Sequence, residues 1–256
     1  MTSFDQVVAR LRRAGCVFAE DEARLLLAES GGGALEPMLA RREAGLPLEQ
    51  VLGWAEFLGL RIALDPGVFV PRRRTEFLAR QAVLAAERAG AEPVVVDLCC
   101  GSGALGAAVL DRLPRAEVHA ADLDDAAVRC ARRNLPPERV HAGDLDEALP
   151  ARLRGRIDVL VVNAPYVPTG SLPLLPPEAR EHEPRLALDG GADGLALHRR
   201  VAAAAPALLA PGGSLLVETS REQAGGTAAA MSGHGLRARV RSDDEVAGTV
   251  AIGVRD

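Results

Sequence analysis

The stretch VVVDLCCGSGALG, residues 94–106, decides the fold of this 256-residue chain. An apolar run leads into two cysteines, and Gly101, Gly103 and Gly106 follow where a buried strand would give way to a helix. Glycines at such a junction let the backbone come close to a ligand, and the first N–H groups of the helix attract an anion. The pattern predicts a strand, a ligand-binding loop and a helix, in that order.

A carboxylate further along the chain narrows the choice of ligand. Asp122 follows the first of these glycines by about 20 residues, the spacing at which a carboxylate can accept hydrogen bonds from ribose hydroxyls. Together with the glycines it indicates a ligand that contains adenosine. A nicotinamide dinucleotide also fits the G-x-G-x-x-G spacing, and glycines that merely turn the chain are a further alternative.

Asp97, ahead of the glycines, favours a different adenosine ligand. The stretch resembles the D-x-G-x-G-x-G loop of S-adenosylmethionine-dependent methyltransferases, with Cys99 in place of the first glycine. Because cysteine carries a Cβ, we expect its backbone to avoid a positive φ. The resemblance implies that S-adenosylmethionine is the cofactor and that it is bound by Asp97, Cys99, Gly101, Gly103, Asp122 and Leu123. Asp144, in the stretch HAGDLDE that follows a further strand-like run, would approach the adenine. It fits a solvated loop or a helix N-cap equally well.

From residue 75 onward, apolar runs alternate with helical patterns. The strand-like runs cover residues 93–98, 116–122, 156–163, 212–220 and 248–254. Such alternation predicts a parallel sheet with helices on both faces, an α/β fold of the Rossmann-like type. Residues 167–194, dense in proline and glycine, form a long irregular stretch, and such stretches are usually functional.

The chain before residue 75 has a different character. Residues 4–45 carry apolar residues at three- and four-residue spacing, which predicts short helices. Residues 53–71 are apolar and aromatic around Asp65-Pro66-Gly67, a predicted turn between two short strands. We therefore expect three parts: a helical domain (1–50), a β-hairpin linker (51–74) and the α/β domain (75–256).

Composition argues against several classes of protein. The formal net charge of −5 disfavours nucleic acid as the main partner. The cysteines lack the paired spacing of zinc sites, so no metal is predicted. No signal peptide or membrane-spanning run is evident, so we expect a cytoplasmic protein with no membrane partner. The sequence indicates no oligomeric state.

A second motif lies where another apolar strand ends. In VLVVNAPYVP the strand stops at Asn163, and Ala164, Pro165 and Tyr166 follow. The tetrapeptide NAPY resembles the N-P-P-Y motif of methyltransferases that act on amide or exocyclic amine nitrogens. The alternative is a strand end that closes in an Asx turn.

The flanking segments extend this resemblance over most of the chain. Residues 51–78 and 181–195 are similar to segments of the HemK-type protein-(glutamine-N5) methyltransferases, and the match spans residues 51–218. The resemblance implies a seven-stranded methyltransferase sheet behind a small helical domain that recognises the substrate. It also implies methyl transfer to the amide nitrogen of a protein glutamine, with a peptide-chain release factor as the substrate.

The chemistry gives a reason for the motif. An amide nitrogen is a poor nucleophile, so the site must orient it towards the methyl group. By the resemblance, the Asn163 side-chain oxygen and the Ala164 carbonyl would accept its N–H groups. Pro165 would hold Ala164 extended, and Tyr166 would form a flat wall. Asn163 would also lie against the cofactor.

Several residues depart from the family's pattern. Ala164 replaces a proline, and Arg73 and Arg74 replace Pro-Glu within an otherwise matching P-R-x-x-T-E segment. In that segment Arg72 and Thr75 would help to close the cofactor pocket, and a solvated helix start capped by Thr75 is the alternative.

These departures leave the methyl acceptor open. Another protein amide or a small metabolite remains an alternative to the release factor. A non-catalytic cofactor-binding module and a nucleic-acid amino-methyltransferase are further alternatives, and the acidic charge disfavours the last.

Overall fold

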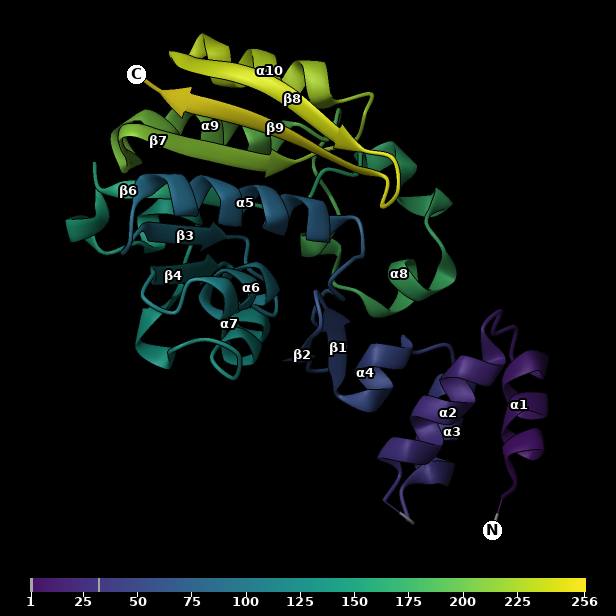
Figure 1. Cartoon of the computed structure of the whole chain (residues 1–256). Coiled ribbons are helices and arrows are strands. Elements are labelled where there is room, and N and C mark those ends of the chain that lie inside the picture. Colours follow the sequence, from purple (N-terminus) through teal and green to yellow (C-terminus); the bar gives the residue numbers. More distant parts are fainter. Residues whose placement is uncertain (1, 32) are drawn as a thin grey trace.

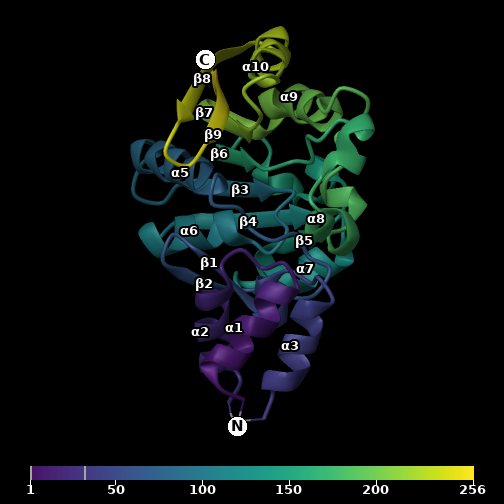
Figure 2. The same cartoon turned by 90° about the vertical axis from the view of Figure 1, so that its right-hand side faces the viewer.

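Seven strands form one sheet in the computed structural model, which describes residues 2–31 and 33–256. They are β3 (Val94–Leu98), β4 (Glu117–Asp122), β5 (Val140–Ala142), β6 (Ile157–Val162), β7 (Leu209–Glu218), β8 (Leu236–Asp243) and β9 (Gly248–Arg255). Their spatial order is β5-β4-β3-β6-β7-β9-β8 (Figures 1 and 2). Neighbours from β5 to β7 pair in parallel, whereas β9 is antiparallel to both of its neighbours. The predicted α/β fold with a seven-stranded sheet is confirmed.

Both faces of the sheet are covered by helices. These are α5 (Thr75–Ala89), α6 (Ala104–Arg112), α7 (Asp125–Ala131), α9 (Ala196–Leu208) and α10 (Ala224–Gly233). Val95 packs into the cluster that contains residues of α5, α6 and α7, and its neighbours Val94 and Val96 pack with α9 and α10. Because successive side chains of a strand point to opposite faces, a strand covered on both sides needs an unbroken apolar run.

The sequence pattern did not indicate strand β8. Three arginines along it, Arg237, Arg239 and Arg241, are exposed, and only Leu236 is fully buried. It forms one edge of the sheet, where charged side chains discourage pairing with a further strand. A strand that is largely exposed lacks the apolar signal by which the others were found.

A helical group precedes the sheet. It consists of α1 (Phe4–Arg13), α2 (Ala19–Glu29), α3 (Leu35–Glu43) and α4 (Leu48–Leu52). Helices this short need packing partners, and here they enclose their own apolar cluster around Leu11, Leu26 and Leu39. Figure 2 shows this group at one end of the molecule and the β8–β9 pair at the other. Within the described residues, no helix is both long and apolar enough to cross a membrane.

A β-hairpin connects the helices to the sheet, but its turn lies elsewhere than predicted. Strands β1 (Trp54–Phe57) and β2 (Leu60–Ala63) pair across Leu58 and Gly59, whose φ angles are 53° and 81°. Two positive φ angles match the twist of a two-residue hairpin turn. The prediction that the turn at Asp65-Pro66-Gly67 joins the two strands was therefore wrong, because a leucine in a conformation that favours glycine hid the turn that does. Those residues form a separate turn after β2, closed by the Val68 N–H and the Asp65 carbonyl.

Asn134, just beyond α7, fastens the hairpin to the glycine loop. Its Oδ1 accepts the Ala63 N–H at 2.8 Å, and its Nδ2 donates to the carbonyls of Ala63 and Ser102, both at 2.8 Å. One side chain thus satisfies backbone groups from two segments that are distant in sequence. The hairpin and the loop after β3 keep a fixed relation because of it.

We expect Asn134→Ala to lower the free energy of unfolding by about 2–4 kcal/mol, because three hydrogen bonds are lost and backbone groups stay unsatisfied. Urea unfolding followed by circular dichroism measures the change. Arg133→Ala is the matched control, since its exposed ion pair with Asp65 should contribute less than about 1 kcal/mol. An equal loss in both variants would contradict the role of Asn134.

Candidate functional site

A cavity of about 750 Å³ opens beyond the carboxyl ends of the parallel strands. Loops that follow parallel strands meet at one edge of the sheet, which is where α/β folds bind ligands. The walls come from the loops after β3, β4, β5 and β6, the segment before α5 and the end of β7. The lining includes Phe69, Arg74, Thr75, Cys99, Gly101, Asp122, Leu123, Asp144, Asn163, Ala164, Pro165, Tyr166 and Glu218. The two sequence motifs therefore face a single cavity.

The glycine loop after β3 is held by backbone hydrogen bonds. The Cys100 N–H donates to the Ala121 carbonyl at 3.2 Å, and the Gly103 N–H donates to the Cys100 carbonyl at 2.7 Å. Cys99 adopts φ of 57°, so the expectation that a cysteine here avoids positive φ was wrong. The surrounding hydrogen bonds impose the conformation that suits a glycine, and Cys99 bears its steric cost.

Asp97 and Gly103 support the loop from behind and do not line the cavity. Asp97 is fully buried, and its Oδ2 accepts the Gly106 N–H at 3.1 Å. Burial raises the pKa of Asp97 to about 7. Its Oδ1 has no hydrogen-bond partner in the described part of the chain. Gly103 precedes α6 in a left-handed conformation, where a Cβ would lie 2.9 Å from a methyl group of Leu135.

Asp122 lies at the cavity with its carboxylate fixed by two backbone groups. Oδ2 accepts the Gly101 N–H at 2.9 Å, and Oδ1 accepts the Asp124 N–H at 2.9 Å. Burial is the main cause that raises the pKa of this carboxyl group. Each oxygen keeps a further lone pair for a ligand hydroxyl. The half-exposed side chain of Leu123 lines the cavity beside it.

Asp144 also lines the cavity, and it is bound to a cation from another element. Its Oδ2 accepts a hydrogen bond from the Arg200 guanidinium of α9 at 2.9 Å. Although Asp144 precedes a 3₁₀ turn, its side chain caps no backbone N–H there, so the helix-cap alternative was wrong. The ion pair fixes the carboxylate at the rim.

Asn163 and Thr75 meet at the wall of the cavity. The Asn163 Nδ2 donates to the Thr75 hydroxyl at 3.4 Å, which leaves the Asn163 Oδ1 available to a ligand. Thr75 is buried and is the first residue of α5, where it caps nothing. The alternative that Thr75 caps the helix was therefore wrong. Instead its hydroxyl contacts the NAPY motif.

Arg72 is directed away from this arrangement. Its guanidinium stacks on Phe69, with 4.7 Å between the guanidinium carbon and the ring centroid, and pairs with Glu183 at 2.5 Å. The same carboxylate accepts the Val70 N–H. Arg72 is not among the residues that line the cavity, so the structure does not bring it to the predicted cofactor position.

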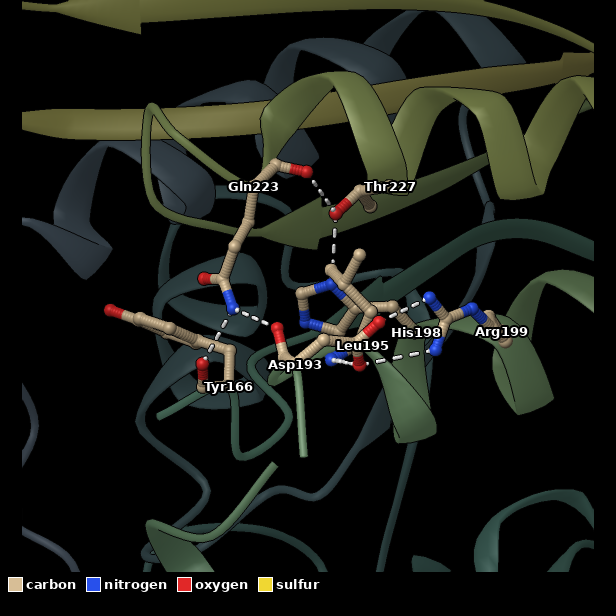
Figure 3. Close-up of polar contacts among 7 residues, drawn as sticks. All are labelled: Tyr166, Asp193, Leu195, His198, Arg199, Gln223 and Thr227. Carbon is tan, nitrogen blue, oxygen red and sulfur yellow. Dashed lines mark hydrogen bonds and ion pairs between the residues drawn. The ribbon is translucent and has the colours of Figure 1, made fainter. Parts of the chain in front are cut away.

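The NAPY motif is fastened by a side chain that the sequence analysis did not single out. Figure 3 shows the Gln223 amide between two carbonyl oxygens, those of Tyr166 at 2.9 Å and Asp193 at 3.0 Å from its nitrogen. Gly194, with φ of 74°, leaves room for this contact, because a side chain there would collide with Gln223 and Tyr166. Behind it, Thr227 contacts the Gln223 carbonyl and His198. An amide at the start of α10 thus holds the motif's backbone.

Two charged residues beside Tyr166, Arg74 and Glu218, were given no role by the sequence analysis. The Tyr166 hydroxyl donates to Glu218 Oε1 at 3.3 Å, and the Arg74 Nε lies 3.4 Å from the same oxygen. The Arg74 guanidinium lies over the Tyr166 ring at 5.8 Å from its centroid. Burial and Glu218 raise the pKa of Tyr166 to about 12. The only sequence signal was an acid at the carboxyl end of a predicted strand.

Comparisons with known proteins agree with this geometry. A family model described as "Methyltransferase small domain" matches residues 59–172. The release factor glutamine methyltransferase of Streptomyces coelicolor is 43% identical over 191 residues, which cover 73% of this chain and 68% of that protein. The one from Deinococcus radiodurans is 36% identical over 257 residues, with 93% and 92% covered.

Two further matches bear on acceptor and fold. The 4-amino-L-phenylalanine/4-methylamino-L-phenylalanine methyltransferase of Streptomyces pristinaespiralis is 37% identical over 239 residues, which cover 84% of this chain and 81% of that protein. A methyltransferase structure from Pyrococcus furiosus superposes with a TM-score of 0.55 at 15% identity, covering 86% of this chain and 97% of that one. At this identity the second match shows the fold alone.

Because Cys99 adopts a left-handed conformation, we expect Cys99→Gly to raise the free energy of unfolding by about 0.5–1 kcal/mol. Thermal and urea unfolding measure it. The neighbouring Cys100 is buried without a positive φ, so Cys100→Gly should destabilise the protein instead. A destabilised Cys99→Gly variant would show that the cysteine side chain contributes more than its backbone costs.

Proposed function

This chain belongs to the release factor glutamine methyltransferase family, and from this premise we propose that it methylates the side-chain amide nitrogen of a glutamine in a peptide-chain release factor, with S-adenosylmethionine as the methyl donor. The resemblance to HemK-type enzymes is thereby confirmed, and the chain is a methyltransferase. One observation supports the specific proposal most. Asp122 and the NAPY residues, from different strands, line the same cavity.

The residues of the cavity fit the proposed donor. Asp122 offers two oriented carboxylate oxygens to ribose hydroxyls. Gly101 has no atom within 4 Å of where a Cβ would lie, so the backbone there is open to a ligand. Asp144 would lie near the adenine. An N–H group of the glycine loop with no hydrogen bond within the described residues, such as that of Ser102, would receive a carboxylate. When bound, S-adenosylmethionine supplies a methyl group on a positively charged sulfur.

On the acceptor side, two oxygens would bind the amide. Asn163 Oδ1 and the Ala164 carbonyl carry no hydrogen bond within the described residues. Each would accept one N–H of the glutamine amide, and Tyr166 would hold the amide plane. The lone pair of the nitrogen would then point at the methyl carbon, which is the condition for in-line displacement.

The N-terminal part would recognise the protein substrate. We propose that residues 1–50 form a helical domain with this role and that residues 51–74 link it to the α/β domain. Their separate apolar cluster supports this division, and residues of the linker, among them Phe69 and Arg74, line the cavity. Because release factors act on ribosomes, the proposal includes a cytoplasmic location.

A second acceptor class is favoured by a specific observation. The relative from Streptomyces pristinaespiralis is named for methylation of an aromatic amine on a free amino acid. Ala164 also departs from the N-P-P-Y motif at the position whose carbonyl would bind the acceptor. A small aromatic amine is therefore the second candidate substrate.

If Asp122 holds the ribose, Asp122→Ala should weaken S-adenosylmethionine binding by about tenfold or more, because charge-assisted hydrogen bonds contribute about 1.5–3 kcal/mol each. Titration calorimetry measures the affinity. Asp125→Ala, an exposed change at the first residue of α7, is the control and should bind normally. Unchanged affinity, or tight binding of a nicotinamide dinucleotide, would overturn the assignment.

Because Asn163 is proposed to orient the acceptor, Asn163→Ala should leave cofactor affinity nearly intact and slow methyl transfer by about a hundredfold or more. Transfer is measured with labelled cofactor on a release factor and on 4-amino-L-phenylalanine. Ala164→Pro, which restores the family's dipeptide, should keep or raise activity on the release factor.

The pattern of these variants separates the candidates. The native protein could methylate only the aromatic amine, and Ala164→Pro could lose this transfer. These two results together would favour the small-molecule acceptor. No transfer to any acceptor by the native protein would leave the binding-module alternative.

A further inference from the structure

Glu218 is a buried carboxylate that the proposed contacts with cofactor and amide do not use. It is the last residue of β7, its exposure is 2%, and it lines the cavity with Asn163 and Tyr166. Its Oε1 contacts the Tyr166 hydroxyl and the Arg74 guanidinium. Its Oε2 has no hydrogen-bond partner among residues 2–31 and 33–256.

Burying such a carboxylate costs free energy. A buried carboxylate oxygen without a partner loses its hydration and regains nothing. The side chain of Arg74 is 48% exposed, so water screens much of its attraction. A glutamine could accept the Tyr166 hydroxyl at a lower cost, because it carries no charge. Holding Tyr166 in place is therefore an insufficient reason for an acid here.

The position beside the amide site offers a reason. When an amide or amine nitrogen takes a methyl group, an N–C bond forms while the C–S bond of the donor breaks with its electron pair on sulfur. The nitrogen then carries a surplus proton, which must leave. In the proposed site Asn163 and Ala164 supply neutral acceptors, and Glu218, which lines the same cavity, is the carboxylate that contacts Tyr166 of this motif.

We propose that Glu218 is a catalytic residue whose free oxygen takes up the proton released by methyl transfer, an N–H proton that Asn163 or Ala164 holds by a hydrogen bond until then. The proton then passes to water, which restores the carboxylate. This inference rests on the proposed methyl transfer to nitrogen, and it holds for either acceptor class. It adds a base to the NAPY motif, whose residues otherwise only orient the acceptor nitrogen.

The neighbours of Glu218 set the pH range in which it works. Burial raises its pKa, whereas Arg74, the Thr75 hydroxyl and Tyr166 act in the opposite sense. Only the ionised form accepts a proton, so turnover should fall as the pH drops through this raised pKa. Removing the charge of Arg74 raises that pKa further, so the acidic limb should move to higher pH.

The decisive variant is Glu218→Gln, with the exposed Glu222→Gln as matched control. We expect Glu218→Gln to lower kcat by about 10²–10⁴-fold, the usual contribution of a positioned base, with little change in KM. Its residual activity should lose the acidic limb, and calorimetry should show unchanged S-adenosylmethionine affinity. Arg74→Gln should shift the acidic limb upward by up to about one pH unit.

A second measurement needs no turnover. A ¹³C NMR titration of glutamate carboxyl groups without ligand should show a raised pKa that belongs to Glu218, because it is absent from Glu218→Gln and is raised further in Arg74→Gln. The raised pKa that burial gives Glu183 should persist in both variants. If Glu218→Gln keeps native kcat and its acidic limb, or the titration lacks the raised pKa of Glu218, the proposal is wrong. If Glu218→Gln fails to fold, the Arg74→Gln shifts decide. Failure of the native protein to transfer methyl at all, with the titration as expected, would refute the proposed function and this role with it.

Discussion

The parallel pairing of β3 with β4 on one side and β6 on the other is the constraint on which the site depends. It forces the glycine loop, Asp122 and Asn163 to emerge at one edge of the sheet, although they lie far apart in sequence. The Gly101 N–H then joins the first two loops by donating to the Asp122 carboxylate. The pairing thus brings the glycine loop and the NAPY motif to the same cavity.

Two buried carboxylates at this edge of the sheet have different surroundings. Asp97 is the last residue but one of β3, Glu218 is the last residue of β7, and burial raises the pKa of each carboxyl group. Asp97 is turned inward to the N–H of Gly106, so it fixes the start of α6. Glu218 instead lines the cavity with one oxygen free. A buried carboxylate near the end of a strand therefore supports the scaffold in one case and faces the cavity in the other.

The fold could be predicted from the sequence to the extent that burial leaves an apolar signal. Unbroken runs such as residues 94–98 revealed the parallel strands, and glycine spacing revealed the loop. The exposed strand β8 and the hairpin turn at Leu58 were not predicted, because their residue types are not typical of the conformations they adopt. In the site, Asp122 and Asn163 lie in recognisable motifs. Gln223 and Arg74 act through tertiary contacts, which no local pattern encodes.

Tertiary contacts also explain how the NAPY motif can have an alanine at position 164. Proline at position 164 would fix φ, and alanine does not. The rigidity is supplied further along the chain: the Val167 N–H donates to the Leu188 carbonyl at 3.1 Å, and the Gly190 N–H donates to the Val167 carbonyl at 2.8 Å. Gln223 holds the Tyr166 carbonyl as well. Hydrogen bonds hold Tyr166 and Val167 on one side of Ala164, and β6 holds the chain on the other. The backbone of Ala164 therefore has little conformational freedom. The loop of residues 167–194 thus stabilises the geometry that the motif's own sequence no longer enforces.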